Sequence, residues 1–382
     1  MLRTVKLGDV CELIGGGTPS KRNPKLYGGS IPWATVRDMH SEYLDGTEFC
    51  ITEEGLASSS SNVIPRGNVI IASRVGLGKV CLLNHDTAIN QDLRGVIPRN
   101  ENEFDTKYLF YWFKSVAEKI ISAGRGATVQ GVTLPFLNAL ELPLPPLAEQ
   151  QRIVAKLDAV FAEIDRAIQI QDCRIQETSS LKATMLVSAM ENQSWQKVKL
   201  NEVCMLRNGR AYKKPELLDE GKYPVLRVGN FFTSDKWYYS DLELDETKYC
   251  DSGDLLYAWS ASFGARIWDG GKVIYHYHIW RVDGDNSKID KKFLFYWFEY
   301  DKEKVKAAHG TGTTMMHVSK GSMEKRDISL PNLGEQAQIV KRLDTSFELL
   351  EARIKALLDN KDNFTQLKLA ILAQELNPSE AA

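Results

Sequence analysis

The 382-residue sequence lacks the signals that place a chain among secreted, membrane or metal-binding proteins. Its six cysteines form no CxxC pair and have no zinc-like spacing, which favours reduced thiols inside a cell. No apolar run is long enough to span a membrane, and the opening residues MLRTVKLGDV contain no apolar signal-peptide core. We therefore expect a cytoplasmic protein that holds no metal.

The sequence also lacks the excess of positive charge that is typical of nucleic-acid-binding proteins. Its formal net charge is −2. Residues 1–146 carry 15 basic and 15 acidic side chains, and residues 195–332 carry 22 and 20. A DNA-binding function therefore requires that basic side chains gather on one face, or that a partner contributes charge.

Common catalytic motifs are missing as well. There is no GxxxxGK[ST] phosphate loop, because the nearest string, SRVGLGKV, has Ser73 where the first glycine is needed. No NPPY or DPPY string occurs. Asp241 with Glu246 and Lys248 faintly imitates a nuclease D…ExK arrangement, but no proline precedes Asp241 and a chance match is the better explanation. We predict no catalytic residue and no cofactor bound by this chain.

What the chain does contain is a long internal repeat. The string LPLPPLAEQQRIVAKLD at 142–158 returns as ISLPNLGEQAQIVKRLD at 328–344, and the string LFYWF at 109–113 returns unchanged at 294–298. Glu149 and its counterpart Glu335 are 186 residues apart. A shared period of this length indicates that a whole structural unit was duplicated.

Each copy of the repeated motif predicts an extended hinge followed by a long helix. Proline fixes φ and disfavours helix in the residue before it, and the acidic residue that follows suits the positive end of a starting helix. No Gly or Pro occurs from about Ala148 to Trp195, or from Glu335 to Asn377. Roughly 40 helical residues would form a rod of about 60 Å.

Apolar residues recur along both helices at steps of three and four, which is the pattern of a coiled-coil seam. In the first helix they are Ile153, Leu157, Val160, Ile164, Ile168, Ile175, Leu181 and Met185, and in the second they are Ile339, Leu343, Phe347, Leu350, Ile354, Leu357, Phe364, Leu367 and Ile371. We expect the two helices to pack antiparallel, with a pseudo-two-fold axis and one globular domain at each end of the rod. A helical hairpin that serves only as a structural spacer is the simpler alternative.

The predicted fold class is α+β, with two similar globular domains separated by the two helices. The predicted segments are a first domain at 1–145, a first helix at 146–194, a second domain at 195–331 and a second helix at 332–382. In the first domain, residues 104–122 predict an amphipathic helix capped by Asp105 or Thr106. Cys11 and Cys204 occupy matching places in LGDVC and LNEVC, and buried small hydrophobic side chains explain this better than reactive thiols.

The two halves share scaffold positions but differ at polar positions that we expect to be exposed. Two recognition domains at a set distance suit a bipartite target. On DNA, distances between half-sites are read in helical turns of about 34 Å. A bridging adaptor that joins two proteins and never touches DNA would have the same outline, so the architecture alone leaves both functions open.

The arrangement resembles the specificity subunit of type I restriction–modification systems. The doubled LPxPxLxEQxxIVxxLD hinge, the strand–loop strings RGNVIIASRVGLGKV and SGDLLYAWSASFGARI, and the LFYWF helix carry this resemblance over nearly the whole chain. One departure is that the second hinge has Asn332 and Gly334 where the first has Pro146 and Ala148. We therefore expect a looser start of the second helix.

The resemblance implies that the two globular units are target-recognition domains, each reading one short half-site of double-stranded DNA. It implies further that the helices form the spacer and bind two modification (methyltransferase) subunits, and that restriction subunits join the complex for cleavage. S-adenosylmethionine and ATP would then be bound by those partners and not by this chain.

Reading DNA requires polar side chains on loops that reach base edges, together with phosphate contacts that hold the register. In the first domain the candidates are Lys21, Arg22, Arg37, Arg74, Lys79, Asn90, Gln91, Arg125, Thr128 and Gln130. In the second they are Lys213, Lys214, Arg227, Asn230, Trp259, Ser260, Ser262, Arg266, His276, His278, Thr311 and Thr313. For each residue alone a solvated surface position is the simpler explanation, and the prediction concerns the loops as sets.

Two further groups have more ordinary explanations. The aromatic residues of both LFYWF strings could be stacking platforms for bases, but their helical spacing and unchanged recurrence favour packing in the core. His276 and His278 would share one face of a strand, yet no Cys or carboxylate completes a set of metal ligands.

Overall fold

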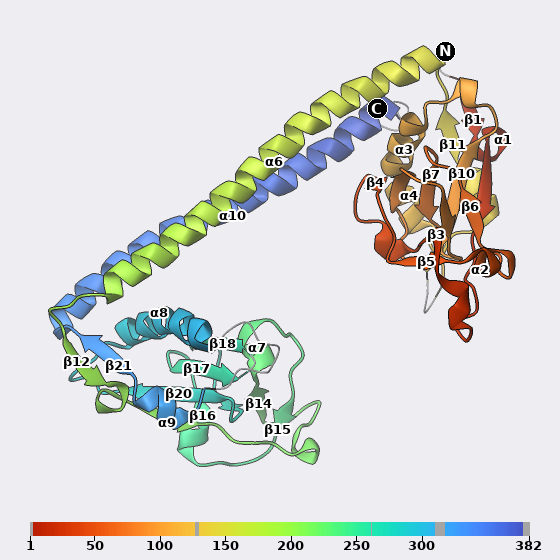
Figure 1. Ribbon diagram of the computed structural model, residues 1–382. Helices are drawn as coiled ribbons and strands as arrows, with labels where there is room; N and C mark the ends of the chain where they lie inside the picture. The colour runs from red at the N-terminus through yellow and green to blue at the C-terminus, as the bar shows by residue number, and fades with distance from the viewer. Residues whose placement is uncertain (1–2, 127–129, 261, 310–317, 377–382) are drawn as a thin grey trace. The chain divides into compact units, whose positions relative to one another are not determined.

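The computed structural model describes residues 3–126, 130–260, 262–309 and 318–376. The chain divides into two compact units, one formed by Met1–Gln171 with Asp359–Ala382 and the other by Asp172–Leu358. We call these unit 1 and unit 2 and describe each by itself. Each unit contains one globular α+β domain and a part of both long helices, α6 (Leu147–Met190) and α10 (Leu333–Leu376) (Figure 1).

The first globular domain is built on two mixed sheets. Its strands are β1 (Thr4–Lys6), β2 (Cys11–Gly15), β3 (Tyr27–Ala34), β4 (Tyr43–Leu44), β5 (Phe49–Ile51), β6 (Asn62–Ile64), β7 (Val69–Ala72), β8 (Val80–Leu83), β9 (Thr87–Ile89), β10 (Leu93–Pro98) and β11 (Glu141–Pro143). One sheet has the order β2-β10-β7-β8-β4 and the other β5-β3-β9-β6, while β1 pairs with β11. Strand β7 is buried on both faces, because Val69 and Ile71 pack into one core cluster and Ile70 and Ala72 into another.

The helices of this domain are short. They are α1 (Leu7–Val10), α2 (Glu53–Ala57), α3 (Thr106–Ser115), α4 (Ala117–Ser122) and α5 (Leu134–Asn138). Asp105 caps α3 as predicted, since its carboxylate accepts hydrogen bonds from the backbone N–H groups of Lys107 (2.8 Å) and Tyr108 (3.2 Å). The prediction of one continuous helix over 104–122 is wrong, because Val116 leaves the helical conformation (φ −101°, ψ 10°) and separates α3 from α4.

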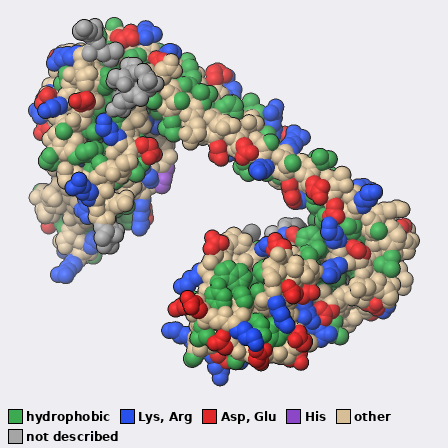
Figure 2. Space-filling view, turned by 180° about the vertical axis from the view of Figure 1, so that it is seen from behind, with side chains coloured by type: hydrophobic (Ala, Val, Ile, Leu, Met, Phe, Trp, Pro, Cys, Tyr) green, Lys and Arg blue, Asp and Glu red, His purple; other side chains and the backbone are tan. Residues whose placement is uncertain are grey.

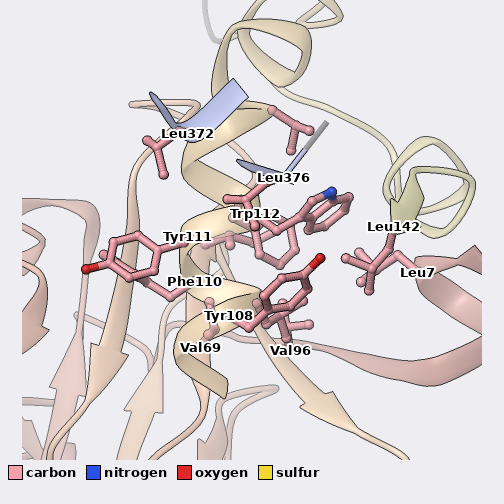
Figure 3. Packing of buried hydrophobic residues seen from close by; sticks show 14 of the residues in the cluster. Leu7, Val69, Val96, Tyr108, Phe110, Tyr111, Trp112, Leu142, Leu372 and Leu376 are labelled. Carbon is pink, nitrogen blue, oxygen red and sulfur yellow. The ribbon is translucent and has the colours of Figure 1, made fainter. Parts of the chain in front are cut away.

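The aromatic run of α3 forms the centre of the unit 1 core. Tyr108, Tyr111 and Trp112 are buried, as Figure 3 shows, among Leu7, Val69, Val96 and Leu142 from the domain and Leu372 and Leu376 from α10. The corresponding run of unit 2 is also mostly buried. The core interpretation of the repeated LFYWF string is therefore confirmed, and these rings are not available to stack on bases.

The second globular domain repeats this plan. Its strands are β12 (Gln196–Lys199), β13 (Cys204–Asn208), β14 (Tyr223–Leu226), β15 (Tyr239–Ser240), β16 (Tyr249–Cys250), β17 (Leu255–Ser260), β18 (Ser262–Ile267), β19 (Val273–Tyr275), β20 (Ile279–Gly284) and β21 (Asp327–Leu330). Its helices are α7 (Val228–Phe232), α8 (Lys291–His309) and α9 (Lys320–Glu324). The sheets have the orders β13-β20-β17-β18 and β15-β14-β19-β16, and β12 pairs with β21 as β1 does with β11.

A buried glutamine joins each long helix to its globular domain. In unit 1 the Gln150 side chain accepts a hydrogen bond from the Asp105 backbone N–H (2.9 Å) and donates to the Glu103 (2.8 Å) and Pro145 (2.9 Å) carbonyls. In unit 2 Gln336 makes the same three bonds, to Asp290 N–H (2.7 Å) and to the Lys288 (2.9 Å) and Pro331 (2.8 Å) carbonyls. Both side chains are fully buried. We call these two sets of bonds the glutamine clasps.

The two long helices are antiparallel where they meet in each unit. In unit 1 the first part of α6, at Leu157 and Ile164, packs with the last part of α10, at Leu372 and Leu376. In unit 2 the last part of α6, at Ala189 and Met190, packs with the first part of α10, at Ile339 and Leu343. Ion pairs join the helices at Lys156–Glu375 (2.7 Å), at Lys368–Asp165 (2.5 Å) and between Lys182 and Glu351.

Most positions of the predicted seam lie inside. Ile153, Leu157, Ile164, Ile339, Leu343 and Phe347 are buried, and Ile168, Leu350 and Ile354 are half-buried. The seam prediction is wrong at Leu181 and Leu367, which are 48% and 45% exposed. The step of six from Ile175 to Leu181 leaves the helix face, and Thr178 takes the inner position. On α10 the step of four from Phe364 leads to Lys368, whose ammonium lies over the Phe161 ring.

The second helix does not start more loosely than its sequence-matched counterpart. The Asn332 side chain accepts a hydrogen bond from the Glu335 N–H (3.0 Å), and the Glu335 carboxylate accepts from the Asn332 N–H (3.2 Å). This reciprocal capping box satisfies helix-terminal donors and compensates for the missing second proline, which counts against the looser start expected there.

All six cysteines are free thiols. Cys11 and Cys204 are buried, and burial raises the pKa of each thiol to about 12, which keeps them protonated and unreactive. Among the helices of the described ranges, none combines the length and the apolar character that crossing a lipid bilayer requires.

Candidate nucleic-acid interface

In the first domain, strand pairing brings several predicted contact loops to one edge. Gly15 at the end of β2 pairs with Arg94, and Ala72 at the end of β7 pairs with Leu93, so the segments after β2, after β7 and before β10 are neighbours. Strand β3 runs parallel to β9, and both strands end at this edge. The segments 16–23, 35–38, 73–79 and 90–92 therefore share one rim of the domain, which we call the loop edge of domain 1.

Backbone hydrogen bonds add the segment around Gln130 to this edge. The Val75 N–H donates to the Gln130 carbonyl (3.2 Å), and the Val132 N–H donates to the Ser73 carbonyl (2.9 Å). Arg125 and Gly131 exchange two further backbone bonds of 3.0 Å. Arg74, Arg125 and Gln130, which are far apart in the sequence, thus come together, and all three are exposed.

Asp92 organises the polar side chains in the middle of this edge. Its carboxylate accepts hydrogen bonds from the side-chain amides of Asn90 and Gln91, each at 3.2 Å, and lies 3.8 Å from the Arg74 guanidinium. Thr18 donates to the Gln91 amide oxygen. Arg74 remains 50% exposed and Gln91 is exposed, whereas Asn90 is buried. Arg74 and Gln91 can therefore reach a ligand, while Asn90 supports the loop.

The remaining candidates of the first domain lie on neighbouring loops. Lys21 and Arg22 are exposed in the turn after β2, and Arg37 is exposed in the turn after β3. The Lys79 ammonium donates to the Val36 carbonyl (3.3 Å), which holds the loop after β7 against that turn. Thr128 lies outside the described residues.

The second domain forms a matching edge from different side chains. Asn208 pairs with Trp280, Ala258 with Ile279, and β14 runs parallel to β19. The segments after β13, β14 and β17 and the turn at 276–278 therefore meet, as their counterparts do in the first domain. We call this rim the loop edge of domain 2. The Arg210 N–H donates to the Tyr275 carbonyl (3.0 Å), which fixes the segment after β13 at the edge.

A stack of aromatic rings runs from the core to this edge. Tyr257 and Trp280 are buried and stacked, with ring centroids 5.9 Å apart, and Trp259 stacks on Trp280 at 5.6 Å. The Trp259 indole N–H donates to the Tyr277 carbonyl (2.9 Å), and the His278 ring meets Trp259 edge-on at 5.1 Å. The stack fixes the turn that carries His276 and His278.

A pocket opens beside this turn. It is lined by Arg227, Val228, Gly229, Asn230, Ser234, Lys236, Tyr238, His276 and His278. Burial, and then the charges of His278 and Arg227, lower the pKa of His276 to about 4, so its imidazole is neutral at neutral pH. Asn230 donates both amide hydrogens internally, to the Ser234 (3.0 Å) and Lys236 (2.8 Å) carbonyls, and therefore shapes the loop instead of reading a base.

Other candidates of the second domain are placed differently. Lys213 and Lys214 are exposed in the segment after β13, and Ser260 is buried at the end of β17. Arg266 pairs with Leu256 toward the opposite end of the β17–β18 hairpin, where it donates to the Phe231 carbonyl (3.2 Å) and Asp269 (2.7 Å). It does not join the edge. Thr311 and Thr313 and the side chain of Ser262 lie outside the described residues.

Sequence reasoning missed Lys236, Tyr238 and Tyr277. Lys236 and Tyr238 line the pocket, and Tyr277 is 38% exposed at the tip of the 276–278 turn. The signal was present in two aromatic strings, KWYY at 236–239 and YHYH at 275–278, which place large rings beside polar groups.

Basic side chains are interspersed with acidic ones on the face that Figure 2 shows, on both globular domains. Within the described part of the chain, no three His, Cys, Asp or Glu side chains gather in a way that could hold a metal ion. The loop edges therefore offer a ligand hydrogen-bonding groups and a few separate cations.

A family model described as "Type I restriction modification DNA specificity domain" matches the chain twice, at residues 2–171 and 192–360. The chain belongs to this family. It carries two copies of the DNA specificity domain, which confirms the resemblance found in the repeated hinge and the LFYWF strings.

Curated relatives agree with this assignment. The specificity subunit of the type I restriction enzyme EcoR124I/EcoR124II from Escherichia coli is 36% identical over 159 residues, which are 40% of this chain and 39% of that one. The MjaIX specificity subunit from Methanocaldococcus jannaschii is 31% identical over 40% of this chain and 36% of its own length. The chain thus matches well under half of these two relatives. The MjaVIII specificity subunit from the same archaeon is 25% identical over 92% of this chain and 87% of that one.

Solved structures share the fold. A chain from a study of complex assembly and conformational transition of the type I R-M system has a TM-score of 0.76 and 22% identity, covering 98% of this chain and 97% of that one. The HsdS subunit from Thermoanaerobacter tengcongensis has a TM-score of 0.53 and 21% identity, covering 98% and 96%. At these identities the likeness concerns the fold alone.

Proposed function

We propose that this chain is the DNA sequence-specificity subunit of a type I restriction–modification complex, and that each globular domain reads one half of an asymmetric, bipartite DNA site. The observation that carries this proposal is the twofold match to the DNA specificity domain. The half-sites differ because the two loop edges carry different side chains: Arg74, Gln91 and Asp92 in domain 1, and Trp259, Tyr277 and His278 in domain 2.

The remaining parts of the proposal concern partners and chemistry. Helices α6 and α10 set the gap between the half-sites and bind two modification (methyltransferase) subunits, and restriction subunits join for cleavage. The chain itself is a non-catalytic, cytoplasmic recognition subunit, and S-adenosylmethionine and ATP are bound by its partners. The glutamine clasps support the spacer role, because each ties the start of a helix to its domain through three hydrogen bonds of a fully buried side chain.

Methylome sequencing of a host that expresses this chain with its modification subunits tests the proposal. We expect a methylated motif of two different short half-sites separated by a fixed gap of unspecified bases. A continuous motif, or a palindromic one without a gap, would contradict the division into two readers.

The alternative of an adaptor that never touches DNA is tested by titration at several salt concentrations. Phosphate contacts make DNA affinity fall steeply as ionic strength rises. An adaptor has no duplex affinity at any salt concentration. Because neither domain carries a large net positive charge, we expect weak binding by the isolated chain and tight binding by the assembled complex.

A further inference from the structure

Two cations, Arg227 and Lys236, line the pocket at the loop edge of domain 2. The Arg227 guanidinium lies 5.4 Å from the centroid of the Tyr238 ring, and the Lys236 ammonium lies 5.4 Å from the same centroid. Both side chains are exposed. Among the described residues neither cation forms an ion pair with a carboxylate, and no acidic side chain lines the pocket.

Hydrogen bonds within the protein fix both walls of the pocket. Asn230 closes the 230–236 loop with its two amide bonds, so the loop presents Lys236 from a fixed backbone position. On the other wall, the 276–278 turn is held by the His276 N–H, which donates to the Leu226 carbonyl (2.9 Å), and by the Trp259 indole. The Tyr238 ring attracts both cations by cation–π contact and keeps them at the pocket, where an anion can meet them.

The shape of the pocket favours a contact with a DNA phosphate over a contact with a base edge. Base edges lie at the floor of the major groove, about 8.5 Å deep, and are read by side chains that protrude. Phosphates stand on the outer ridges of the duplex, and a recess with cations in its walls can receive them. Arg227 and Lys236 line a recess, whereas Tyr277 stands exposed at the tip of the neighbouring turn.

We propose that the pocket formed by Arg227, Lys236 and Tyr238 receives one backbone phosphodiester of the DNA and sets the register in which domain 2 lies on its half-site. This assigns Arg227 to positioning and leaves base reading to the neighbouring 276–278 turn. The inference rests on the proposed function, because it names the part of the DNA that this pocket holds.

The test compares Arg227→Ala and Lys236→Ala with the unchanged chain, each purified with its modification subunits and titrated with labelled duplex over a series of salt concentrations. Each variant should weaken binding by roughly tenfold and reduce the magnitude of the slope of log K against log salt, by at most about one because a single phosphate is neutralised. The loss should be equal for a duplex that carries the recognised motif and for one in which it is scrambled. An unchanged slope in both variants would overturn the proposal.

Arg227→Lys separates a phosphate contact from a base contact. A lysine keeps the point charge that a phosphate needs, but it loses the fork that makes two hydrogen bonds to guanine. We expect near-normal affinity and unchanged sequence preference. Loss of discrimination at a single base pair would show that Arg227 reads a base, and would refute the phosphate assignment.

Lys222→Ala is the matched control. Lys222 precedes β14 whereas Arg227 follows it, and its ammonium is paired with Glu243. This variant should keep the affinity and the slope of the unchanged chain, and thermal melting checks that all variants fold. If Lys222→Ala reduces the slope as much as Arg227→Ala does, the effect is general charge and not the pocket.

Two further arms separate the possible failures. Replacing chloride by inorganic phosphate at equal ionic strength should lower the DNA affinity of the unchanged chain more than that of Arg227→Ala, because free phosphate competes for the pocket; an equal loss in both would contradict the pocket assignment. If the unchanged complex binds no duplex at any salt concentration, the proposed DNA-recognition function itself is wrong, which differs from a complex that binds DNA but ignores the pocket variants.

Discussion

At the scale of single residues, one buried side-chain amide in each unit joins a long helix to its globular domain. Gln150 has the exposed Gln151 as its neighbour, yet only Gln150 is buried and bonds to one backbone N–H and two backbone carbonyls. Of the two, the repeat keeps only Gln150, because the second copy has Gln336 at its place and Ala337 at the place of Gln151, but this recurrence does not name the groups that the amide bonds. The clasp could not be predicted from pattern alone, because whether an amide faces inward depends on the elements that pack around it.

Replacing Gln150 by Leu tests the clasp. The change leaves a buried donor and two acceptors without partners, and we expect unit 1 to lose about 3 kcal/mol of unfolding free energy. Chemical denaturation of the full chain measures the loss, with Gln151→Leu as the control. Equal stability of the two variants would mean that the buried bonds contribute nothing.

His276 gives the second domain a specific dependence on pH. Its pKa is lowered from 6.5 to about 4 by burial, by His278 and by Arg227, so between these values the unfolded state binds a proton that the folded state excludes. This contribution to stability is full above pH 6.5 and is lost as pH falls toward 4. We expect the melting temperature of His276→Asn to fall less than that of the unchanged chain over this interval. Parallel curves would contradict the assignment.

Among the candidate contacts, polar residue type alone did not distinguish exposed residues that can reach DNA from residues that stabilise a loop. Asn90 and Asn230 are both predicted DNA contacts, but Asn90 is buried and both residues use their side-chain amides for hydrogen bonds within the protein. Arg74 and Gln91 keep exposed groups at the edge. Contact residues follow from loop conformation, which a single sequence does not encode in a periodic signal.

At the scale of elements, the period of the repeat made most of the fold predictable. The two long helices, the hinge before each and the aromatic core helix follow from prolines, apolar spacing and the unchanged LFYWF string. The break at Val116 and the exposure of Leu181 and Leu367 could not be predicted. Each helix has more apolar residues than its inner face can bury, and the packing of neighbouring elements decides which of them are buried. Periodicity identifies a face only to within one residue step.

Paired substitutions on α10 test which side of the helix faces inward. Phe364 packs against the unit 1 core, whereas Leu367 is 45% exposed. We expect Phe364→Ala to cost about 2 kcal/mol and Leu367→Ala less than about 0.5 kcal/mol, because the first removes a large ring packed against the core. Denaturant midpoints of the two variants provide the measurement. A larger cost for Leu367 would place the seam where the sequence pattern alone had put it.

At the scale of the whole molecule, the proposed division of labour separates reading from spacing. Inserting about four residues near Gln176 adds roughly one turn to α6 and keeps its faces nearly in phase. We expect the methylated motif to keep both half-sites and to change only the number of bases between them. Methylome sequencing of a host with the inserted variant decides the question, and altered half-sites would show that the helices and the readers are not independent.

The glutamine clasps have a consequence for how such a chain diversifies. Both halves use one joint, built from a helix glutamine, two main-chain carbonyls and one main-chain amide, and none of these depends on the side chains of the loop edges. A foreign domain with the same backbone turn before its aromatic helix, and with the same proline hinge at its end, can form the same three bonds. New DNA specificities can therefore arise by exchange of a whole globular domain, while helices α6 and α10 stay the same.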